Sequence, residues 1–210
     1  EFPRKVVRNI LGYGIATVLI DNYRPNVEVD SVTTDGFTAS RQIVDHLVSL
    51  GHRNIAFMAY EQDGYNADQR EAGFTDGIQA NKLSLTHCPT LRNFTETTGA
   101  FESLQYEIKK RHAPTAVIMV NDTLASEMQM CLKNEGFNIP KDISIFGFDD
   151  HSLSIHQAPP ISTVRVNRNK IAEAGASLIL KRIQNCKRPV ENIILPVELV
   201  HRESVAAPRK

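Results

Sequence analysis

The chain has 210 residues, 41% hydrophobic and 23% charged, which is enough to bury a core as one large or two smaller lobes. Its 24 basic residues equal its 24 acidic ones, so it lacks the broad basic field that nonspecific nucleic-acid binding requires. Three widely spaced cysteines, Cys88, Cys131 and Cys186, argue against a disulfide framework or a zinc site and favour a reducing compartment. No apolar run approaches the ~18–20 residues of a membrane span.

The start of the chain, "EFPRKVVRNILGYG", has no Met and no signal peptide, and it enters with a helix-like pattern. We therefore expect the sequence to be an excised piece of a longer protein.

Strands and helices are predicted to alternate along the chain. A short helix ends near Gly12, and the β-branched apolar run "GIATVLID" at 14–21 predicts a strand. Apolar residues in 34–51 follow the i, i+3, i+4 spacing of a helix, with Gly51 as its stop. Further strands are predicted at 54–60, 115–120 and 143–148, further helices at 66–82, 95–112, 122–136 and 169–185, and extended segments at 159–166 and 192–204. Continuous apolar strands between amphipathic helices predict an α/β fold, with parallel sheets flanked by helices.

Polar side chains follow four of the predicted strands. In open α/β sheets, ligands bind beyond the carboxyl ends of the strands, so these side chains form a convergent set of candidates. They are Asp21 after the first strand, Arg70 after 54–60, Asn121 with Asp122 after 115–120, and Asp149 with Asp150 after 143–148.

Each of these residues also has a purely structural interpretation. Asp and Asn at strand-to-helix junctions are commonly N-caps, so either Asn121 or Asp122 can cap its helix while the other faces the ligand edge. Asp21 and Asp149, each taken alone, are more typical of turns than of ligand contacts.

Arg70 is more informative, because a cation near a helix N-terminus meets the unfavourable end of the dipole, at a cost of about 0.3–1 kcal/mol. We expect an anionic or hydroxyl-rich partner to hold it there; the alternative is a surface salt bridge with Glu71 or Asp68. Phe94 lies in a predicted loop, where it either packs under that loop or stacks on a ligand.

No catalytic signature is present: the sequence contains no G-x-S-x-G, H-E-x-x-H, G-x-x-x-x-G-K-[ST] or G-x-G-x-x-G motif. The adjacent Asp149 and Asp150 suggest a Mg²⁺ pair, but neighbouring residues of an extended chain point to opposite sides. His46 and His52, six residues apart, imply no metal pair. We therefore expect neither an enzyme nor a bound cofactor, and we assign Asp149 to ligand contact and Asp150 to local hydrogen bonding.

Several motifs, in order, resemble the effector-binding part of lac repressor/galactose repressor-type (LacI-type) transcription regulators, whose fold is that of periplasmic sugar-binding proteins. The matching segments are "HLVSLGHRNIAF" (46–57), "QREAGF" (69–74), "PTAVIMVNDTLASE" (114–127), "NIPKDISIFGFDD" (138–150), "PPISTVRVNRNKIAEAGASLIL" (159–180) and "LPVELVHRESVA" (195–206).

The resemblance implies two α/β lobes with an effector, a sugar or nucleoside, held between them. Residues 1–33 and 162–191 would form an incomplete N-terminal lobe, and residues 34–161 and 192–210 the C-terminal lobe. The family's effector-contacting positions fall on Asp21, Arg70, Asn121 and Asp149, and its aromatic stacking position falls on Phe94.

The resemblance also implies a cytoplasmic homodimer or dimer of dimers, without a membrane anchor. DNA would be bound only through an N-terminal helix-turn-helix domain, which has no counterpart in these 210 residues. A solute-binding protein for sugar transport, which shares the fold, is the alternative.

Overall fold

The computed structural model describes residues 4–62 and 64–209, and the chain divides into two compact units. The first unit comprises Glu1–Asp35, Gly64–Asn66 and Val166–Val197, and the second comprises Gly36–Asp63, Ala67–Arg165 and Glu198–Lys210. The chain passes between the units at Asp35–Gly36, Arg165–Val166 and Val197–Glu198, and the short segment Gly64–Asn66 also counts with the first unit.

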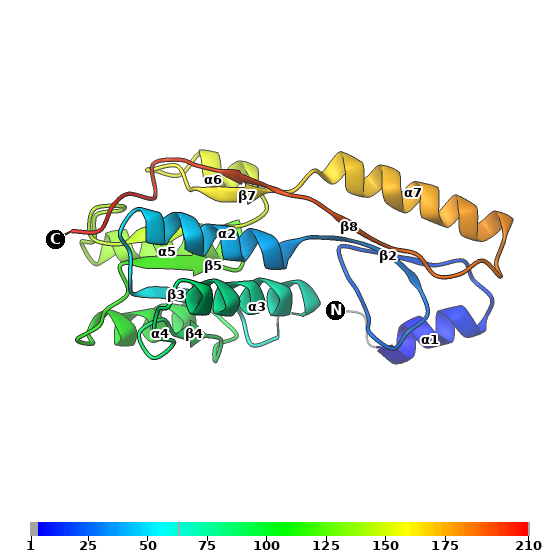
Figure 1. The fold of residues 1–210 in the computed structure, drawn as a ribbon, viewed down its shortest axis with the longest axis horizontal. Coiled ribbons are helices and arrows are strands. Elements are labelled where there is room, and N and C mark those ends of the chain that lie inside the picture. The colour runs from blue at the N-terminus through cyan, green and yellow to red at the C-terminus, as the bar shows by residue number, and fades with distance from the viewer. Residues whose placement is uncertain (1–3, 63, 210) are drawn as a thin grey trace. The chain divides into compact units, whose positions relative to one another are not determined.

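A three-stranded parallel sheet forms the first unit. Its strands, in spatial order, are β1 (Val18–Ile20), β2 (Asp30–Thr34) and β8 (Asn192–Leu195). Helix α7 (Arg168–Gln184) runs along this sheet (Figure 1) and packs Ile171 and Leu178 against Val32 of β2. The helix approaches closely at Gly175, where a Cβ would lie 2.8 Å from Cδ1 of Ile20. Helix α1 (Arg4–Gly12) also belongs to this unit.

A four-stranded parallel sheet forms the centre of the second unit. Its strands, in spatial order, are β4 (Thr90–Leu91), β3 (Ile55–Met58), β5 (Ala116–Met119) and β6 (Ser144–Phe146). Every residue of β3, β5 and β6 is buried, as expected for parallel strands covered on both faces. The helices are α2 (Gly36–Ser49), α3 (Tyr65–Ala80), α4 (Thr97–Ile108), α5 (Asp122–Asn134) and the short α6 (Ser152–Ile155). The predicted alternation of strands and helices is confirmed (Figure 1).

Helices α2 and α3 lie side by side, and two glycines of α3 face α2 with no room for a Cβ. A Cβ at Gly73 would lie 2.1 Å from the carbonyl oxygen of Phe37, and one at Gly77 would lie 2.9 Å from Cβ of Val44. Phe74, between these glycines, stacks on Phe57 of β3 with 5.6 Å between ring centres. Small residues on one helical face and an aromatic on the other therefore fix α3 between α2 and the sheet.

The last sheet differs from the sequence prediction. The extended run at 192–204 divides into β8, in the first unit, and β9 (Glu198–Val200), in the second. Strand β9 pairs antiparallel with β7 (Thr163–Arg165), with Thr163 opposite Val200 and Arg165 opposite Glu198. These two short strands lie directly beside two of the passages between the units.

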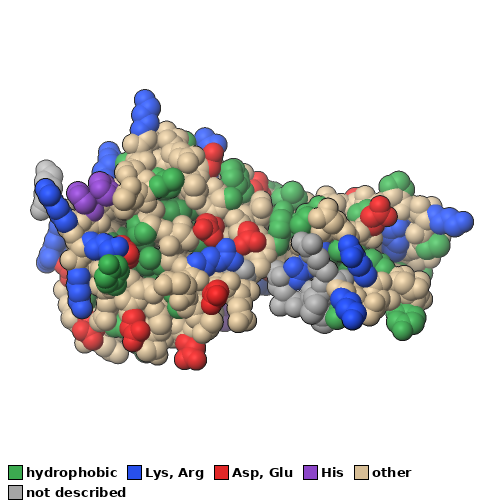
Figure 2. Space-filling view, turned by 90° about the horizontal axis from the view of Figure 1, so that it is seen from below, with side chains coloured by type: hydrophobic (Ala, Val, Ile, Leu, Met, Phe, Trp, Pro, Cys, Tyr) green, Lys and Arg blue, Asp and Glu red, His purple; other side chains and the backbone are tan. Residues whose placement is uncertain are grey.

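Acidic and basic side chains are interspersed on the face of the molecule in Figure 2, consistent with the balanced composition. None of the helices in the described part of the chain combines the length and the hydrophobicity needed to cross a bilayer.

Candidate functional site

Arg70 is the centre of the polar set at the carboxyl edge of the second sheet. Its side chain is only 7% exposed, and it donates from Nη1 to the carbonyl oxygen of Val120, at the end of β5, over 2.5 Å. Nη2 lies 3.3 Å from Oδ1 of Asp149, which follows β6. The guanidinium also lies 3.6 Å from the centre of the Phe148 ring, a cation–π contact.

These contacts identify what holds a buried cation near the start of α3. The Asp149 carboxylate, a strand-end carbonyl and an aromatic face together compensate for the unfavourable helix dipole. The alternative salt bridge of Arg70 with its helix neighbours is wrong, because Asp68 and Glu71 instead pair with Arg92, at 2.7 and 2.9 Å.

Asp149 occupies a backbone conformation that L-residues rarely adopt, with φ at 103°, and Asp150 follows with φ at 49°. The Asp149 amide donates to the carbonyl oxygen of Val164 over 2.9 Å, and its side chain remains 35% exposed. Strained backbone of this kind persists where surrounding contacts fix it, and it occurs preferentially at ligand sites. The Asp149 carboxylate therefore reaches both Arg70 and solvent.

Asp150 turns away from this site, as its local contacts confirm. Its Oδ1 accepts from Nη2 of Arg202 over 2.5 Å, and its Oδ2 accepts from Nε of Arg165 over 2.6 Å. Burial would raise the pKa of Asp150, but hydrogen bonds and charge from Arg202 and Arg165 outweigh it and lower the pKa below its usual value. The two adjacent acids thus face different partners. Among the described residues, no three His, Cys, Asp or Glu side chains are grouped to hold a metal ion.

Asn121, not Asp122, caps α5. The Asn121 backbone is extended, with φ at −152°, and its Oδ1 accepts from the amide of Leu124 over 2.9 Å. The capping role considered for Asp122 is therefore wrong. Asp122 is the first residue of the helix, and its own side chain turns inward.

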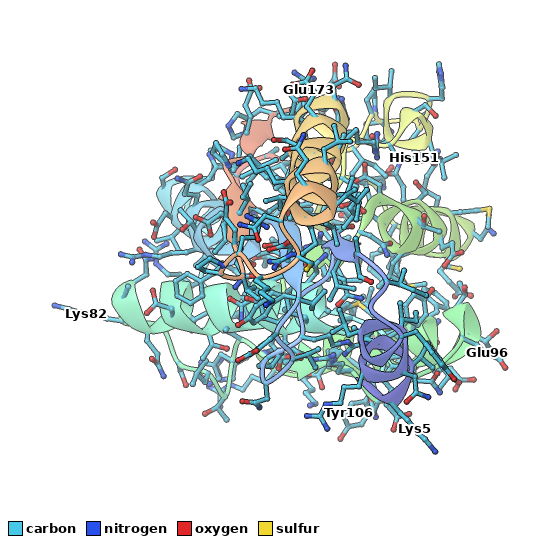
Figure 3. The ribbon with its side chains drawn as sticks, turned by 90° about the vertical axis from the view of Figure 1, so that its right-hand side faces the viewer. Lys5, Lys82, Glu96, Tyr106, His151 and Glu173 are labelled. Atoms are coloured by element: carbon cyan, nitrogen blue, oxygen red, sulfur yellow. The ribbon has the colours of Figure 1, made fainter. Side chains whose placement is uncertain are left out.

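The Asp122 carboxylate is 1% exposed and cross-links three segments of the second unit. Oδ1 accepts from Oγ1 of Thr163 over 2.6 Å, and Oδ2 accepts from the amide of His151 over 2.7 Å. His151 in turn caps the short helix α6, beside which it is labelled in Figure 3. Burial raises the pKa of Asp122, and the charge of Asp149 raises it further.

Phe94 follows β4 and is 4% exposed, packed edge-on against Tyr60 with 5.5 Å between ring centres. The Tyr60 hydroxyl donates to Oε2 of Glu127 over 3.0 Å, and Oγ1 of Thr97 donates to the same oxygen over 2.8 Å. The sequence did not single out Tyr60 or Glu127 as site residues, although Glu127 ends the matching segment 114–127. The position of Tyr60 at the end of a predicted strand was the available signal.

Asp21 lies in the first unit, just after β1, with φ at 53°. Its amide donates to the carbonyl oxygen of Val32 over 2.8 Å, and its Oδ1 accepts from Nδ2 of Asn66 over 2.7 Å. Of the five predicted site residues, the structure thus gathers Arg70, Asn121 and Asp149 at one strand edge. Phe94 lies in the loop after β4 of the same sheet, and Asp21 ends a strand of the other sheet.

Parallel α/β sheets whose carboxyl edge carries a buried arginine, a partly exposed carboxylate and aromatic rings define a protein of the ligand-binding α/β class. The family described as "Periplasmic binding protein-like domain" matches residues 44–205, and the chain belongs to this family.

Similar proteins carry regulator names. The chain is 24% identical over 208 residues to "HTH-type transcriptional repressor PurR" of Haemophilus influenzae (strain PittEE), a match that covers 98% of this chain and 62% of the repressor. The chain therefore spans less than two thirds of the length of this curated relative.

Two solved structures share the fold. A LacI family transcriptional regulator from Enterococcus faecium with bound ribose superposes with a TM-score of 0.87 at 26% identity, over 97% of this chain and 75% of that one. A LacI transcriptional regulator from a Rhodococcus species gives 0.89 at 25% identity, over 100% and 77%. The predicted periplasmic-binding-protein-like fold and the similarity to LacI-type regulators are confirmed.

Proposed function

We propose that this chain is the effector-sensing part of a LacI-type transcriptional regulator and that its effector is a sugar or a sugar-like molecule such as a nucleoside. The observation that carries the proposal is the Arg70–Asp149 pair at the carboxyl edge of a parallel sheet, where the Asp149 side chain is 35% exposed. The ribose in the Enterococcus faecium relative supports a polyhydroxylated effector. The regulator names of the relatives favour this function over solute binding for transport.

Each predicted site residue has a distinct role in this proposal. Asp149 accepts hydrogen bonds from effector hydroxyls, and Arg70 orients Asp149 and supplies a forked donor. Asn121 presents its amide beside them, because its Oδ1 already caps α5. Phe94 covers an apolar ring face. Asp21 is proposed as a further acceptor on the first unit.

No bond is made or broken in this mechanism, so the chain is proposed to act as a binding protein rather than as an enzyme. An effector that binds one conformation more tightly than another shifts the equilibrium toward it by that difference in affinity. In the whole protein, we propose, this shift controls operator binding through a helix-turn-helix region. We further propose a cytoplasmic homodimer or dimer of dimers, as the resemblance implies.

Isothermal titration calorimetry tests the site directly, with D-ribose, D-galactose, D-glucose, cellobiose, adenosine and hypoxanthine as probes. For any probe that binds, Asp149→Ala and Arg70→Ala should each weaken affinity about 10–100-fold, the usual worth of a charge-assisted hydrogen bond. Asp142→Ala is the matched control, because this carboxylate pairs with Arg209 in the same unit. Unchanged affinity in both site variants would show that the effector binds elsewhere.

Asp21→Ala, Asn121→Ala and Phe94→Ala extend the same experiment to the remaining site residues. A loss of affinity of about tenfold or more is expected for each residue that contacts the effector. A variant that binds as tightly as the parent removes that residue from the site.

A further inference from the structure

The loop that carries Asp149 forms hydrogen bonds from its backbone amides to residues of strand β7. The Asp149 amide donates to the carbonyl oxygen of Val164 over 2.9 Å, and the Asp150 amide lies 3.4 Å from Oγ1 of Thr163. Thr163 also donates to Asp122, whose other carboxylate oxygen accepts from the amide of His151, so His151 is linked to this strand indirectly, through Asp122. Strand β7 therefore supports the backbone of this loop.

The Asp150 carboxylate connects the same loop to one residue of β7 and to one residue that follows β9. Arg165, which its carboxylate binds, is the last residue of the second unit before the chain enters the first. Across the β7–β9 pair, Arg165 lies opposite Glu198, the residue at which the chain returns, and the two side chains are 3.8 Å apart. Arg202, the other partner of Asp150, lies just beyond the end of β9.

We propose that Asp150 is a positioning residue that acts through Asp149 and transmits the state of the Arg70–Asp149 site to Arg165 and Glu198, at two passages between the units. Its biological meaning, an effector signal carried to the rest of a regulator, rests on the proposed function. The physical coupling within the second unit does not depend on the proposed function.

The geometry distinguishes this network from ordinary surface ion pairs. The side chains of Asp150 and Arg202 are each only 11% exposed, so solvent screens their attraction weakly. The two arginines both bind the Asp150 carboxylate, and the backbone of Asp150 is in the left-handed region, with φ at 49°. A residue in that conformation is held there by its surrounding contacts, because few neighbouring backbone states are open to it.

The rival explanation is that Asp150 only stabilises the fold. In that case, changes at Asp149 and at Asp150 act independently on the strand ends, and their effects add. Transmission through Asp150 instead predicts that the effect of an Asp149 change becomes much smaller once the Asp150 carboxylate is removed. Non-additivity at a distant readout is therefore the property to measure.

The test is amide hydrogen exchange on the full chain without ligand, in a cycle of parent, Asp149→Asn, Asp150→Asn and the double variant. Asn is used because it tolerates positive φ as Asp does. The readout is exchange in peptides that cover residues 162–168 and 196–201. In the parent background, Asp149→Asn should speed exchange there by about threefold or more, and in the Asp150→Asn background by a much smaller factor.

An equal factor in both backgrounds overturns the proposal, as does an Asp149→Asn variant that leaves exchange in both peptides unchanged. A parallel cycle of Asp149→Asn with Asp142→Asn should be additive, because Asp142 pairs with Arg209 outside this network. If Asp150→Asn does not fold, Arg165→Gln replaces it with the same expected outcomes, since the Arg165 side chain is 48% exposed and is not part of the core. Because no ligand is used, failure of the proposed function leaves this result unchanged, and the reverse also holds.

Discussion

Oδ1 of Asp122 accepts a 2.6 Å hydrogen bond from the hydroxyl of Thr163, so a buried carboxylate joins the first residue of α5 to strand β7. Removing it with Asp122→Ala leaves the Thr163 hydroxyl and the His151 amide without their acceptor, and should lower the free energy of unfolding by about 2–4 kcal/mol. Asp122→Asn should cost less, because its amide oxygen can accept from His151 while its NH₂ donates to Thr163. Urea unfolding measures both changes.

The control for the Asp122 variants is Asp76→Ala. Asp76 is 44% exposed and pairs with Arg41 at 3.4 Å, a surface ion pair that contributes about 0–1 kcal/mol. If Asp122→Ala proved no more destabilising than this control, the cross-link would have no energetic role.

Gly147 faces the same carboxylate, and Gly147→Ala should be strongly destabilising. A Cβ at this position would lie 2.2 Å from Oδ1 of Asp122 and 3.4 Å from Cβ of Ala125, so the buried carboxylate would have to move. We expect a loss of about 2–4 kcal/mol in chemical denaturation. In the control, Gly12→Ala, a Cβ would meet nothing within 4 Å, and stability should hold or rise slightly. Equal stability of the two variants would contradict the packing described.

The buried imidazole of His52 should make stability fall as the pH is lowered through about 6.5. Its Nε2 lies 2.8 Å from the carbonyl oxygen of Ala206, and its Nδ1 lies 2.8 Å from Oγ1 of Thr115. Burial lowers the pKa of His52, and it outweighs the hydrogen bond to Ala206, which acts in the opposite direction. Below its usual pKa, the unfolded chain therefore takes up a proton that the folded chain resists, and unfolding becomes easier.

The measurement is unfolding free energy at pH 8, 7, 6 and 5 for the parent and for His52→Gln. The parent should lose up to about 1.4 kcal/mol per pH unit more than the variant below pH 6.5. Burial and the charge of His201 also lower the pKa of His46, so part of the pH dependence should remain in the variant. Parallel curves for parent and His52→Gln would exclude the assigned role.

Asp30 should dominate the stability of the first unit. It is fully buried and receives two bonds from Arg182, at 2.9 Å each, one from Arg188 at 2.7 Å, and one from the amide of Glu191 at 2.8 Å. Asp30→Ala leaves Arg182 without this counter-ion and leaves Arg188 paired with Glu191 alone, at 2.6 Å, and it should cost about 3–5 kcal/mol. Hydrogen exchange in peptides that cover α7 and β2 would detect the loss of unfolding free energy. A loss smaller than that caused by Asp76→Ala would contradict the prediction.

The pH dependence of Asp30 has the opposite sign to that of a buried neutral acid. Burial would raise its pKa, but the hydrogen bonds and charges of Arg182, Arg188 and the Glu191 amide together lower it. The stabilisation is therefore present above the usual pKa of 3.8 and is lost as the pH falls through the lower, folded value. The difference between parent and Asp30→Ala should accordingly shrink only in strong acid.

The hydrophobic pattern predicted the strands that consist of apolar residues and missed the polar strand and the shortest elements. Runs such as 115–120 reveal buried parallel strands directly, whereas β2 reads "DSVTT" and is nevertheless buried along its whole length. Its polar side chains are satisfied by specific partners, such as Asn192 for Ser31, and periodicity cannot anticipate these pairings. Strand β4 and helix α6, at two and four residues, are too short to carry a pattern.

The site was predictable to the extent that strand ends determine position. Arg70, Asn121 and Asp149 were selected because they follow strands, and the parallel sheet brings those ends together. The choice between Asn121 and Asp122 as cap was not predictable, because both side chains can cap and only the backbone angle of Asn121 decides. The sequence placed the lobe boundaries after residues 33, 161 and 191, whereas the two compact units divide after Asp35, Arg165 and Val197.

The positive φ angles of Asp149 and Asp150 also limit which sequences this loop can accept during evolution. Outside glycine, Asp and Asn tolerate such angles best, so each position can exchange a carboxylate for an amide while the backbone keeps its path. A longer acid such as Glu would preserve the charge and strain the chain. A change of ligand preference at Asp149 is therefore expected to occur by substitution with Asn, which removes the charge. Substitution with a longer acid is not expected.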